Sequence, residues 1–468
     1  MTALPGLLPA ATDDARSSAP FALSVVTAAR FPEWIAAHTE STRRWLQAQG
    51  FTGAAGTHAL LPGSDGLAGA VLGVGDLHDP FAYAHAPGAL PAGDWRLVDD
   101  GLPDDAARDA LHLGWGLGSY RFTRYRDAAR PPARLVADVD DDIAAQLAAC
   151  VRVRDLINTP TEHMGPDELE AVARDIAQTH GADLDVLTGD DLLAHNFPAI
   201  HAVGRASHRA PRLIVMHWGG NTDEGRARPH LVIVGKGVCF DTGGLDIKAA
   251  AGMRNMKKDM GGAAHAIALA ELIMARKLPV RFTLLVPAVE NAIGPNAYRP
   301  GEVVATRKGI SVEIDNTDAE GRVILCDALT YAGEQAPVMI LDFATLTGAA
   351  RVALGPDLPA LFSNDDALAN EWLSAGAAQH DPLWRMPLHR PYLRYLNSGI
   401  ADIANGSNST MAGCVTAALY LERFVPADQA WAHLDVYSWN DNDRPGRPAG
   451  GEAQALRSCY AMLKARFA

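Results

Sequence analysis

The chain has 468 residues, which predicts more than one domain and enough length to bury sizeable apolar cores. Acidic residues outnumber basic residues by 55 to 41, and the formal net charge of −14 disfavours nucleic acid as a partner, because a duplex usually binds to a basic face. The five cysteines form no C-x-x-C pair, so neither a thiolate zinc site nor a disulfide framework is expected. The sequence shows no basic leader and no apolar run of membrane-spanning length, and we therefore expect a cytoplasmic protein with no membrane partner.

The first third of the chain mixes strand and helix patterns. We expect strands at 21–27 and 68–74 and helices at 31–49 and 104–113. The segment that follows, G-W-G-L-G-S-Y-R-F-T-R-Y at 114–125, lacks the G-x-G-x-x-G spacing of a phosphate loop, so we expect it to serve packing.

A linker and a long helix come next. Pro131 and Pro132 cannot continue a helix, which predicts a linker at 127–134. Residues 140–157 then carry apolar side chains at helical spacing behind an acidic start, which suits the helix dipole.

The remaining two thirds alternate regularly between the two patterns. The predicted strands are 182–186, 213–218, 230–235, 280–288 and 338–343, with a hairpin from 303–306 and 311–314. The predicted helices are 166–179, 263–276 and 323–332. Strands that alternate with helices favour an α/β fold with a mostly parallel, doubly wound sheet flanked by helices.

Acidic and basic side chains gather in three glycine-rich segments of this region. They are G-K-G-V-C-F-D-T-G-G-L-D-I-K with Lys236, Asp241 and Lys248, M-K-K-D-M-G-G with Asp259, and N-T-D-A-E-G-R with Asp318, Glu320 and Arg322. Ligands bind beyond the carboxyl ends of strands in open α/β sheets. Any one of these acids alone would be read as a solvated turn residue. Carboxylates crowded together repel one another unless cations lie between them, so the set predicts a two-metal site.

The spacing within the third segment supports the same interpretation. Asp318 and Glu320 are two residues apart, so an extended backbone would direct both carboxylates to one side.

These segments resemble the leucyl aminopeptidase (cytosol aminopeptidase) family. The heptapeptide N-T-D-A-E-G-R is unbroken at 316–322, and the block G-K-G-x-x-F-D-[ST]-G-G-x-x-x-K fits 235–248. The resemblance covers the C-terminal two thirds and, more loosely, the N-terminal third. It implies a smaller α/β N-terminal domain at 1–140, a linking helix at 141–158 and a catalytic domain at 159–468. It also implies peptide substrates and a homohexamer.

The resemblance assigns metal ligands to five positions. Asp241 and Glu320 would bridge two divalent ions, zinc or manganese, with Asp259 at the tighter site and Asp318 at the looser one. Lys236 would give one ion a neutral nitrogen, since nearby cations and burial disfavour its ammonium form.

The resemblance also implies the catalytic roles. A metal-bound water would attack the carbonyl of the first residue, with the peptide α-amine held by one ion. Lys248 would polarise that carbonyl. Arg322, helped by backbone near Leu346, would hold a bicarbonate ion as the base.

The side-chain pocket is implied less completely. The resemblance places Met256, Asn316, Thr345 and Gly348 around it. The segment 405–413, N-G-S-N-S-T-M-A-G, departs from the family pattern beside the same pocket, which leaves the preferred N-terminal residue open.

Other interpretations remain open from the residues alone. Lys248 could be a solvated charge, and Arg322 a structural partner for a carboxylate. A binuclear phosphoesterase also gathers acids at strand ends but usually adds histidine ligands, and none of the 16 histidines joins these motifs. A non-catalytic regulator or DNA-binding protein on the same fold is the third possibility.

Overall fold

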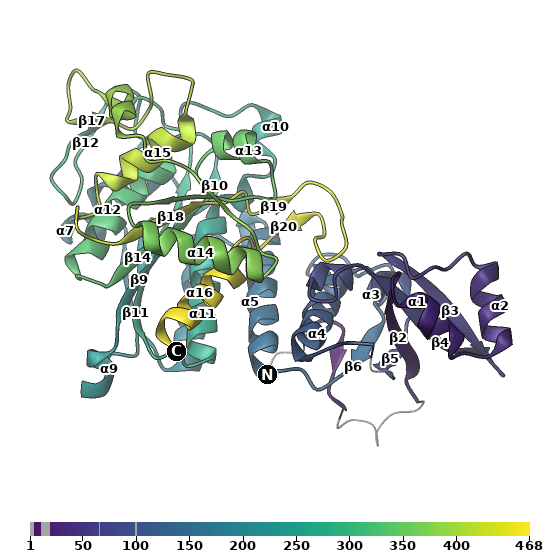
Figure 1. The fold of residues 1–468 in the computed structure, drawn as a ribbon. Coiled ribbons are helices and arrows are strands. Elements are labelled where there is room, and N and C mark those ends of the chain that lie inside the picture. The colour runs from purple at the N-terminus through teal and green to yellow at the C-terminus, as the bar shows by residue number, and fades with distance from the viewer. Residues whose placement is uncertain (1–3, 11–18, 65, 99–100) are drawn as a thin grey trace. The chain divides into compact units, whose positions relative to one another are not determined.

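The computed structural model describes residues 4–10, 19–64, 66–98 and 101–468 (Figure 1). Contacts divide the chain into two compact units. Unit 1 comprises Met1–Val151 and Asn440–Ala449, and unit 2 comprises Arg152–Trp439 and Gly450–Ala468. The chain therefore passes from one unit to the other three times.

Unit 1 contains a six-stranded sheet with the order β1-β6-β5-β2-β4-β3. Its pairs are parallel except for the β3–β4 pair, which is antiparallel. The strands are β1 (Leu7–Leu8), β2 (Phe21–Thr27), β3 (Thr57–Gly63), β4 (Gly66–Val74), β5 (Asp94–Leu97) and β6 (Arg134–Val136). The helices are α1 (Phe31–Ala36), α2 (Glu40–Ala48), α3 (Ala86–Ala89) and α4 (Asp105–Ser119). The single helix expected at 31–49 is divided, because Thr39 caps a new helix by accepting a hydrogen bond from the Thr42 backbone N–H.

Helix α4 runs six residues beyond the predicted end at residue 113, through the glycine-rich segment. A Cβ at Gly114 would lie 1.9 Å from the carbonyl oxygen of Pro80, and one at Gly118 would lie 2.1 Å from that of Ala84. A Cβ at Gly116 would lie 2.2 Å from Leu147. These glycines permit close approach of neighbouring backbone, so the segment serves packing, as expected, but as part of a helix.

Unit 2 is built on a nine-stranded sheet with the order β16-β15-β18-β14-β9-β11-β8-β7, and β10 pairs with β11. The central pairs β18–β14, β14–β9, β9–β11 and β10–β11 are parallel. The strands are β7 (Asp183–Thr188), β8 (Arg212–Trp218), β9 (His230–Gly235), β10 (Gly237–Asp241), β11 (Arg281–Asn291), β14 (Met339–Ala344), β15 (Ala360–Ser363), β16 (Trp384–Arg385) and β18 (Trp431–Asp435). Smaller sheets contain β12 (Val303–Val304), β13 (Val312–Glu313) and β17 (Ile403–Ala404), and β19 (Trp439–Asn440) with β20 (Gly450–Gly451).

Helices pack on both faces of this sheet. On β9, Val232 and Val234 belong to the apolar cluster that includes helices α8, α12 and α15. The neighbouring Gly235 faces α11, where an added Cβ would lie 2.6 Å from Ala263. Because alternate residues of a strand point to opposite faces, the sheet is covered on both sides, and the predicted doubly wound α/β fold is confirmed.

The helices of unit 2 follow the predicted pattern at α6, α11 and α12. The helices that lie wholly in unit 2 are α6 (Pro166–His180), α7 (Asp191–Ala194), α8 (Pro198–Gly204), α9 (Asp223–Ala227), α10 (Ala250–Met253), α11 (Gly261–Ala275), α12 (Glu320–Glu334), α13 (Gly348–Leu354), α14 (Asp366–Ala378), α15 (Gly413–Glu422) and α16 (Leu456–Phe467). The helix expected at 140–157 is α5 (Asp141–Asn158), and the change from unit 1 to unit 2 falls within it.

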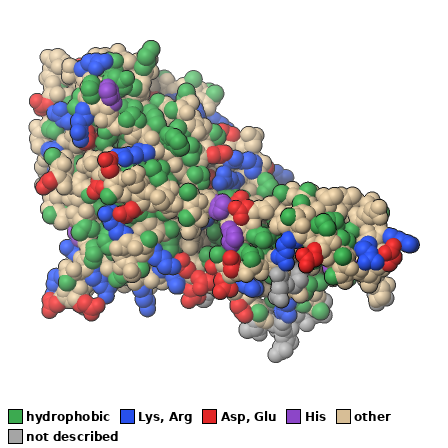
Figure 2. All heavy atoms as spheres, in the orientation of Figure 1, with side chains coloured by type: hydrophobic (Ala, Val, Ile, Leu, Met, Phe, Trp, Pro, Cys, Tyr) green, Lys and Arg blue, Asp and Glu red, His purple; other side chains and the backbone are tan. Residues whose placement is uncertain are grey.

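On the face drawn in Figure 2, acidic and basic side chains are mixed rather than gathered into one basic area. Across the described part of the chain, no helix is both long and apolar enough to cross a lipid bilayer. All five cysteines are buried free thiols.

Candidate active site

The carboxyl ends of four parallel strands meet at one edge of the unit 2 sheet. Lys236 directly follows β9, and Asp241 is the last residue of β10. Thr345 follows β14, and Asp435 ends β18. A separate strand, β10, was not predicted, and it places Asp241 by pairing in parallel with β11. This is the edge at which open α/β sheets bind ligands.

Asp259 reaches the same edge from a short 3₁₀ helix, Met256–Met260, that leads directly into α11. A Cβ at Gly262 would lie 2.1 Å from the carbonyl oxygen of Phe343, so glycine allows this helix end to meet β14. The Thr345 hydroxyl lies 2.8 Å from Asp259 Oδ1 and fixes that carboxylate.

Asp318 and Glu320 are placed differently from expectation. The backbone is not extended, because Asp318 lies in a turn and Glu320 is the first residue of α12. The turn is held by Asn316, whose Oδ1 accepts a hydrogen bond from the Asp318 backbone N–H at 2.8 Å. Both carboxylates nevertheless line the same cavity.

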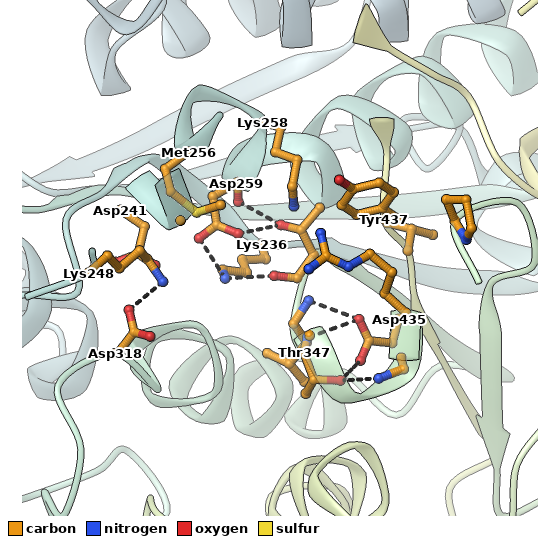
Figure 3. Close-up of a pocket in the computed structure, with 18 of the residues that line it drawn as sticks. Lys236, Asp241, Lys248, Met256, Lys258, Asp259, Asp318, Thr347, Asp435 and Tyr437 are labelled. Atoms are coloured by element: carbon orange, nitrogen blue, oxygen red, sulfur yellow. Dashed lines mark hydrogen bonds and ion pairs between the residues drawn. The ribbon is translucent and has the colours of Figure 1, made fainter. Parts of the chain in front are cut away.

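That cavity has a volume of about 450 Å³ and brings the predicted metal ligands together with Lys248 (Figure 3). Its lining includes Lys236, Asp241, Lys248, Asp259, Asp318 and Glu320. Residues far apart in the sequence thus form one concave surface on which several charged side chains converge, which marks it as the candidate active site.

The two lysines pair with the four acids. Lys236 Nζ lies 2.7 Å from Asp259 Oδ2, 2.9 Å from Glu320 Oε1 and 2.9 Å from the carbonyl oxygen of Thr345. Lys248 Nζ lies 2.7 Å from Asp241 Oδ2 and also pairs with Asp318 Oδ1. Burial alone would lower the pKa of Lys236, but the charges of Asp259 and Glu320 outweigh it and raise that pKa. The neutral lysine expected from the sequence therefore depends on cations at these carboxylates.

The carboxylates are crowded in a way that suits metal ions. Burial raises the pKa of Asp241, and the negative charge of Asp259 raises it further. Burial also raises the pKa of Glu320 well above its usual range, with a further contribution from the charge of Asp241. One oxygen each from Asp241, Asp259 and Glu320 can be chosen so that all lie within 4.8 Å of one another. Asp259 Oδ2 accepts no hydrogen bond of good geometry, although Lys236 Nζ is 2.7 Å away. Among the described residues, this cluster is all carboxylate and contains no histidine.

Arg322 lies outside the cavity lining and is buried. Its Nη1 donates to the carbonyl oxygen of Asn405 at 2.7 Å, whereas its Nε has no hydrogen-bond partner in the described structure. Burial lowers the pKa of this guanidinium. An orphaned donor on a buried cation fits an anion such as bicarbonate. The Leu346 backbone N–H donates to Asp435 Oδ1 at 3.0 Å, so a second bond from it to an anion would require that contact to change.

Only some of the residues predicted to form the side-chain pocket line the cavity. Met256, Thr345 and Gly348 line the cavity, and Asn316 does not. Asn316 instead supports the turn beside Asp318, and its carbonyl oxygen accepts a hydrogen bond from Asn405 Nδ2 at 2.7 Å.

Among the cavity-lining residues that the sequence did not identify, four have charged or aromatic side chains: Lys258, Arg351, Asp435 and Tyr437. Lys258 stood within a quoted motif, beside Asp259, but nothing in the sequence distinguished it from a solvated lysine. The pKa of Lys258 is lowered to about 8 by burial. Asp435 and Tyr437 come from a strand end more than 170 residues away from it in the chain.

Comparison with known proteins gives two family matches. Residues 151–460 match the catalytic domain of the cytosol aminopeptidase family, and residues 21–138 match the N-terminal domain of the M17 aminopeptidases. A probable cytosol aminopeptidase of Syntrophotalea carbinolica is 40% identical over 384 residues, which cover 78% of this chain and 76% of that protein.

Solved structures give the same result. The crystal structure of a cytosol aminopeptidase from Coxiella burnetii is 45% identical, covers 99% of both chains and superposes with a TM-score of 0.93. The bottromycin maturation enzyme BotP, solved in complex with Mn, is 32% identical, covers 96% of this chain and 100% of its own, and has a TM-score of 0.86.

Proposed function

Because this chain belongs to the cytosol aminopeptidase family of metal-dependent aminopeptidases, we propose that it removes the N-terminal residue from peptides with two divalent ions at the cavity of unit 2. The observation that carries this proposal is the buried set of oxygens from Asp241, Asp259 and Glu320 within 4.8 Å of one another. Without cations, that many carboxylates in one buried place would repel.

Five residues would hold the ions. Asp241 and Glu320, which are 2% and 1% exposed, would contribute to both ions, and Asp259, Asp318 and Lys236 would complete the two sites. Oxygen-rich ligation suits manganese or zinc, and the manganese complex of BotP supports manganese as one candidate. When bound, two such ions supply Lewis acidity and lower the pKa of a coordinated water, which is the nucleophile for the peptide carbonyl.

Lys248 is the residue proposed to polarise the scissile carbonyl. Its ammonium lines the cavity beside Asp241 and Asp318 and is more exposed than that of Lys236. Burial would lower its pKa, but Asp241 and Asp318 outweigh burial and raise it, so Lys248 remains a charged donor. A charged donor aimed at the developing oxyanion is the contribution this residue makes.

Arg322 is proposed to hold a bicarbonate ion that serves as the base. The support is its buried guanidinium with an unpartnered Nε. The backbone N–H of Leu346, which lines the cavity, would be a second donor once it is released from Asp435.

Assembly and location complete the proposal. The extent of the family match supports a homohexamer in the cytoplasm, and the relatives are named cytosol aminopeptidases. Light scattering is expected to report about six times the chain mass of 49.7 kDa. A monodisperse monomer that is fully active on peptides would refute the hexamer.

The activity is tested with two chromogenic substrates. The enzyme loaded with Mn²⁺ is expected to release p-nitroaniline from leucine p-nitroanilide and to leave p-nitrophenyl phosphate intact. Hydrolysis of the phosphate ester alone would favour the phosphoesterase that the sequence left open.

A further inference from the structure

Lys258 places a buried cation that forms no ion pair with the described residues in the wall of the cavity. Only 8% of the residue is exposed. Its Nζ lies 4.9 Å from the ring centroid of Tyr437, and Figure 3 shows its amine directed toward that ring and the open space. Within the described residues the Lys258 amine makes no ion pair and no hydrogen bond. Lysines are almost never this buried unless they are paired.

Two acids, Asp259 and Asp435, act on the charge of Lys258, and both are already engaged, Asp259 with Lys236. Asp435 Oδ1 accepts hydrogen bonds from the backbone N–H groups of Leu346 and Thr347, at 3.0 and 3.2 Å. Its Oδ2 accepts one from the Thr347 hydroxyl at 2.6 Å. Figure 3 shows this carboxylate bound to the turn at Thr347 rather than to Lys258. The acid therefore fixes the turn after β14 and leaves the lysine unpaired.

A second cation contacts the same ring. Arg351, on α13, has its Cζ 4.8 Å from the Tyr437 centroid and forms no ion pair with the described residues. An aromatic ring attracts cations through its quadrupole, but it carries no net charge. Two cations around one neutral ring, neither of them in an ion pair with the described residues, form a positive wall that can donate to an anionic group of a ligand.

The positive wall adjoins the space for the substrate's first side chain. Lys258, Arg351 and Tyr437 line the same cavity as Met256 and the carboxylate cluster. A residue whose α-amine and carbonyl lie at the cluster would extend its side chain into this cavity. A carboxylate on that side chain would meet both cations, each able to donate a charge-assisted hydrogen bond.

We propose that Lys258 and Arg351, set around Tyr437, form a carboxylate subsite that selects peptides with an acidic first residue, glutamate or aspartate. The inference rests on the proposed aminopeptidase function and adds a substrate class to it. The free C-terminal carboxylate of a very short peptide has the same chemistry, so the experiment distinguishes the two sources.

The test compares matched peptides at pH 7 with the Mn²⁺-loaded enzyme. Glu-Ala-Ala-amide and Gln-Ala-Ala-amide differ in side-chain charge alone, and Leu-Ala and Leu-Ala-amide differ in the C-terminal charge alone. We expect kcat/KM to favour the glutamate peptide over the glutamine peptide by about tenfold or more, the scale of one charge-assisted hydrogen bond. Lys258→Met is expected to reduce that ratio about tenfold, Arg351→Met to reduce it less, and Lys258→Arg to retain most of it.

Lys257→Met is the matched control. Lys257 adjoins Lys258, but its Nζ donates to the Asn158 carbonyl oxygen and lies over the Trp439 ring, away from the cavity lining. This variant should keep the wild-type ratio. Metal content, measured for every variant, separates loss of the subsite from disturbance of the adjacent Asp259.

Three results would overturn the inference. A wild-type ratio near one, or a ratio unaffected by Lys258→Met and Arg351→Met, would make the two cations supports for Tyr437. If the wild-type enzyme prefers Leu-Ala to Leu-Ala-amide, and Lys258→Met and Arg351→Met lose only that preference, the two cations bind the C-terminal carboxylate of the peptide instead. Hydrolysis of the glutamine and leucine peptides would support the proposed aminopeptidase function even if the carboxylate subsite is refuted. A complete lack of hydrolysis of all four peptides would refute the aminopeptidase function itself.

Discussion

Two of the places where unit 2 buries charged side chains differ in how those charges are paired. Arg154, on α5, and Glu452, after β20, form a buried ion pair in which the guanidinium Nε and Nη2 lie 3.1 and 2.9 Å from Glu452 Oε1. No side-chain atom of this pair is left without a hydrogen bond. At the cavity, four carboxylates share two lysines, and Asp259 Oδ2 and Asp318 Oδ1 accept no hydrogen bond of good geometry.

The difference separates a structural charge from a functional one. A satisfied, bidentate pair stabilises one arrangement and has nothing left to offer a ligand. A cluster of carboxylates that lines a cavity and has too few basic partners can still bind cations. Both sites are buried, so burial alone does not identify function; the balance of donors and acceptors does.

Removing metal should have the largest effect. If the acidic cluster exists to hold cations, dialysis against a strong chelator should abolish peptide hydrolysis, and Mn²⁺ or Zn²⁺ should restore it. Asp259→Ala should lower the metal content measured by elemental analysis. Full activity after exhaustive chelation would erase the proposed contrast between the two charge clusters.

Breaking the structural pair should affect stability instead. Glu452→Ala removes the carboxylate that accepts hydrogen bonds from the buried Arg154 guanidinium, which should lower the free energy of unfolding by about 3–5 kcal/mol. Denaturant unfolding measures this. The control is Glu271→Ala, which breaks the more exposed pair of Arg152 on the same helix and should cost about 1 kcal/mol or less. Equal losses from the two variants would contradict the structural role.

Lys248→Ala should affect catalysis without affecting metal. Because it removes a donor to the developing oxyanion, kcat should fall about 100- to 1000-fold while metal content stays at the wild-type level. Steady-state kinetics and elemental analysis measure the two quantities. A rise in KM with little change in kcat would make Lys248 a substrate contact rather than a catalytic residue.

Arg322→Ala should reduce kcat less than removal of the metal or Lys248→Ala does. We expect a loss of about 10- to 100-fold, the scale of one charge-assisted hydrogen bond. Added bicarbonate should restore part of the rate if the arginine positions that ion. Thermal unfolding of the same variant serves as the control, because Arg322 is buried. Loss of rate that only follows loss of folded protein would make Arg322 structural.

Much of the fold could be predicted from the sequence. The apolar run at 230–235 gave β9 with its correct bounds, and the alternation of strands and helices gave the doubly wound sheet. The short strand β10 was missed because Lys236 and two glycines interrupt the apolar pattern around it. Pairing with β11, some fifty residues later, is what makes it a strand.

The candidate site was predictable where chemistry lies in local motifs. Glycine-rich segments located four of the acids and two of the lysines that line the cavity. The geometry at Asp318 and Glu320 was not predictable, since a turn and a helix start replace the expected extended backbone. Lys258 and Tyr437 were missed because their importance comes from a contact across 179 residues of chain, which no local pattern records.

The ten-residue segment Asn440–Ala449 has a consequence for how the protein is made. It belongs to unit 1, where Arg447 Cζ lies 4.0 Å from the Phe81 ring centroid and Gly446 packs beside Ala84. Domains generally fold as units during synthesis, in order from the N-terminus. Unit 1 emerges first from the ribosome, yet its final piece is translated only after nearly all of unit 2. Completion of the first-made unit therefore waits for almost the entire chain, and a nascent chain stopped at residue 439 carries a Phe81 ring that Arg447 has not yet covered.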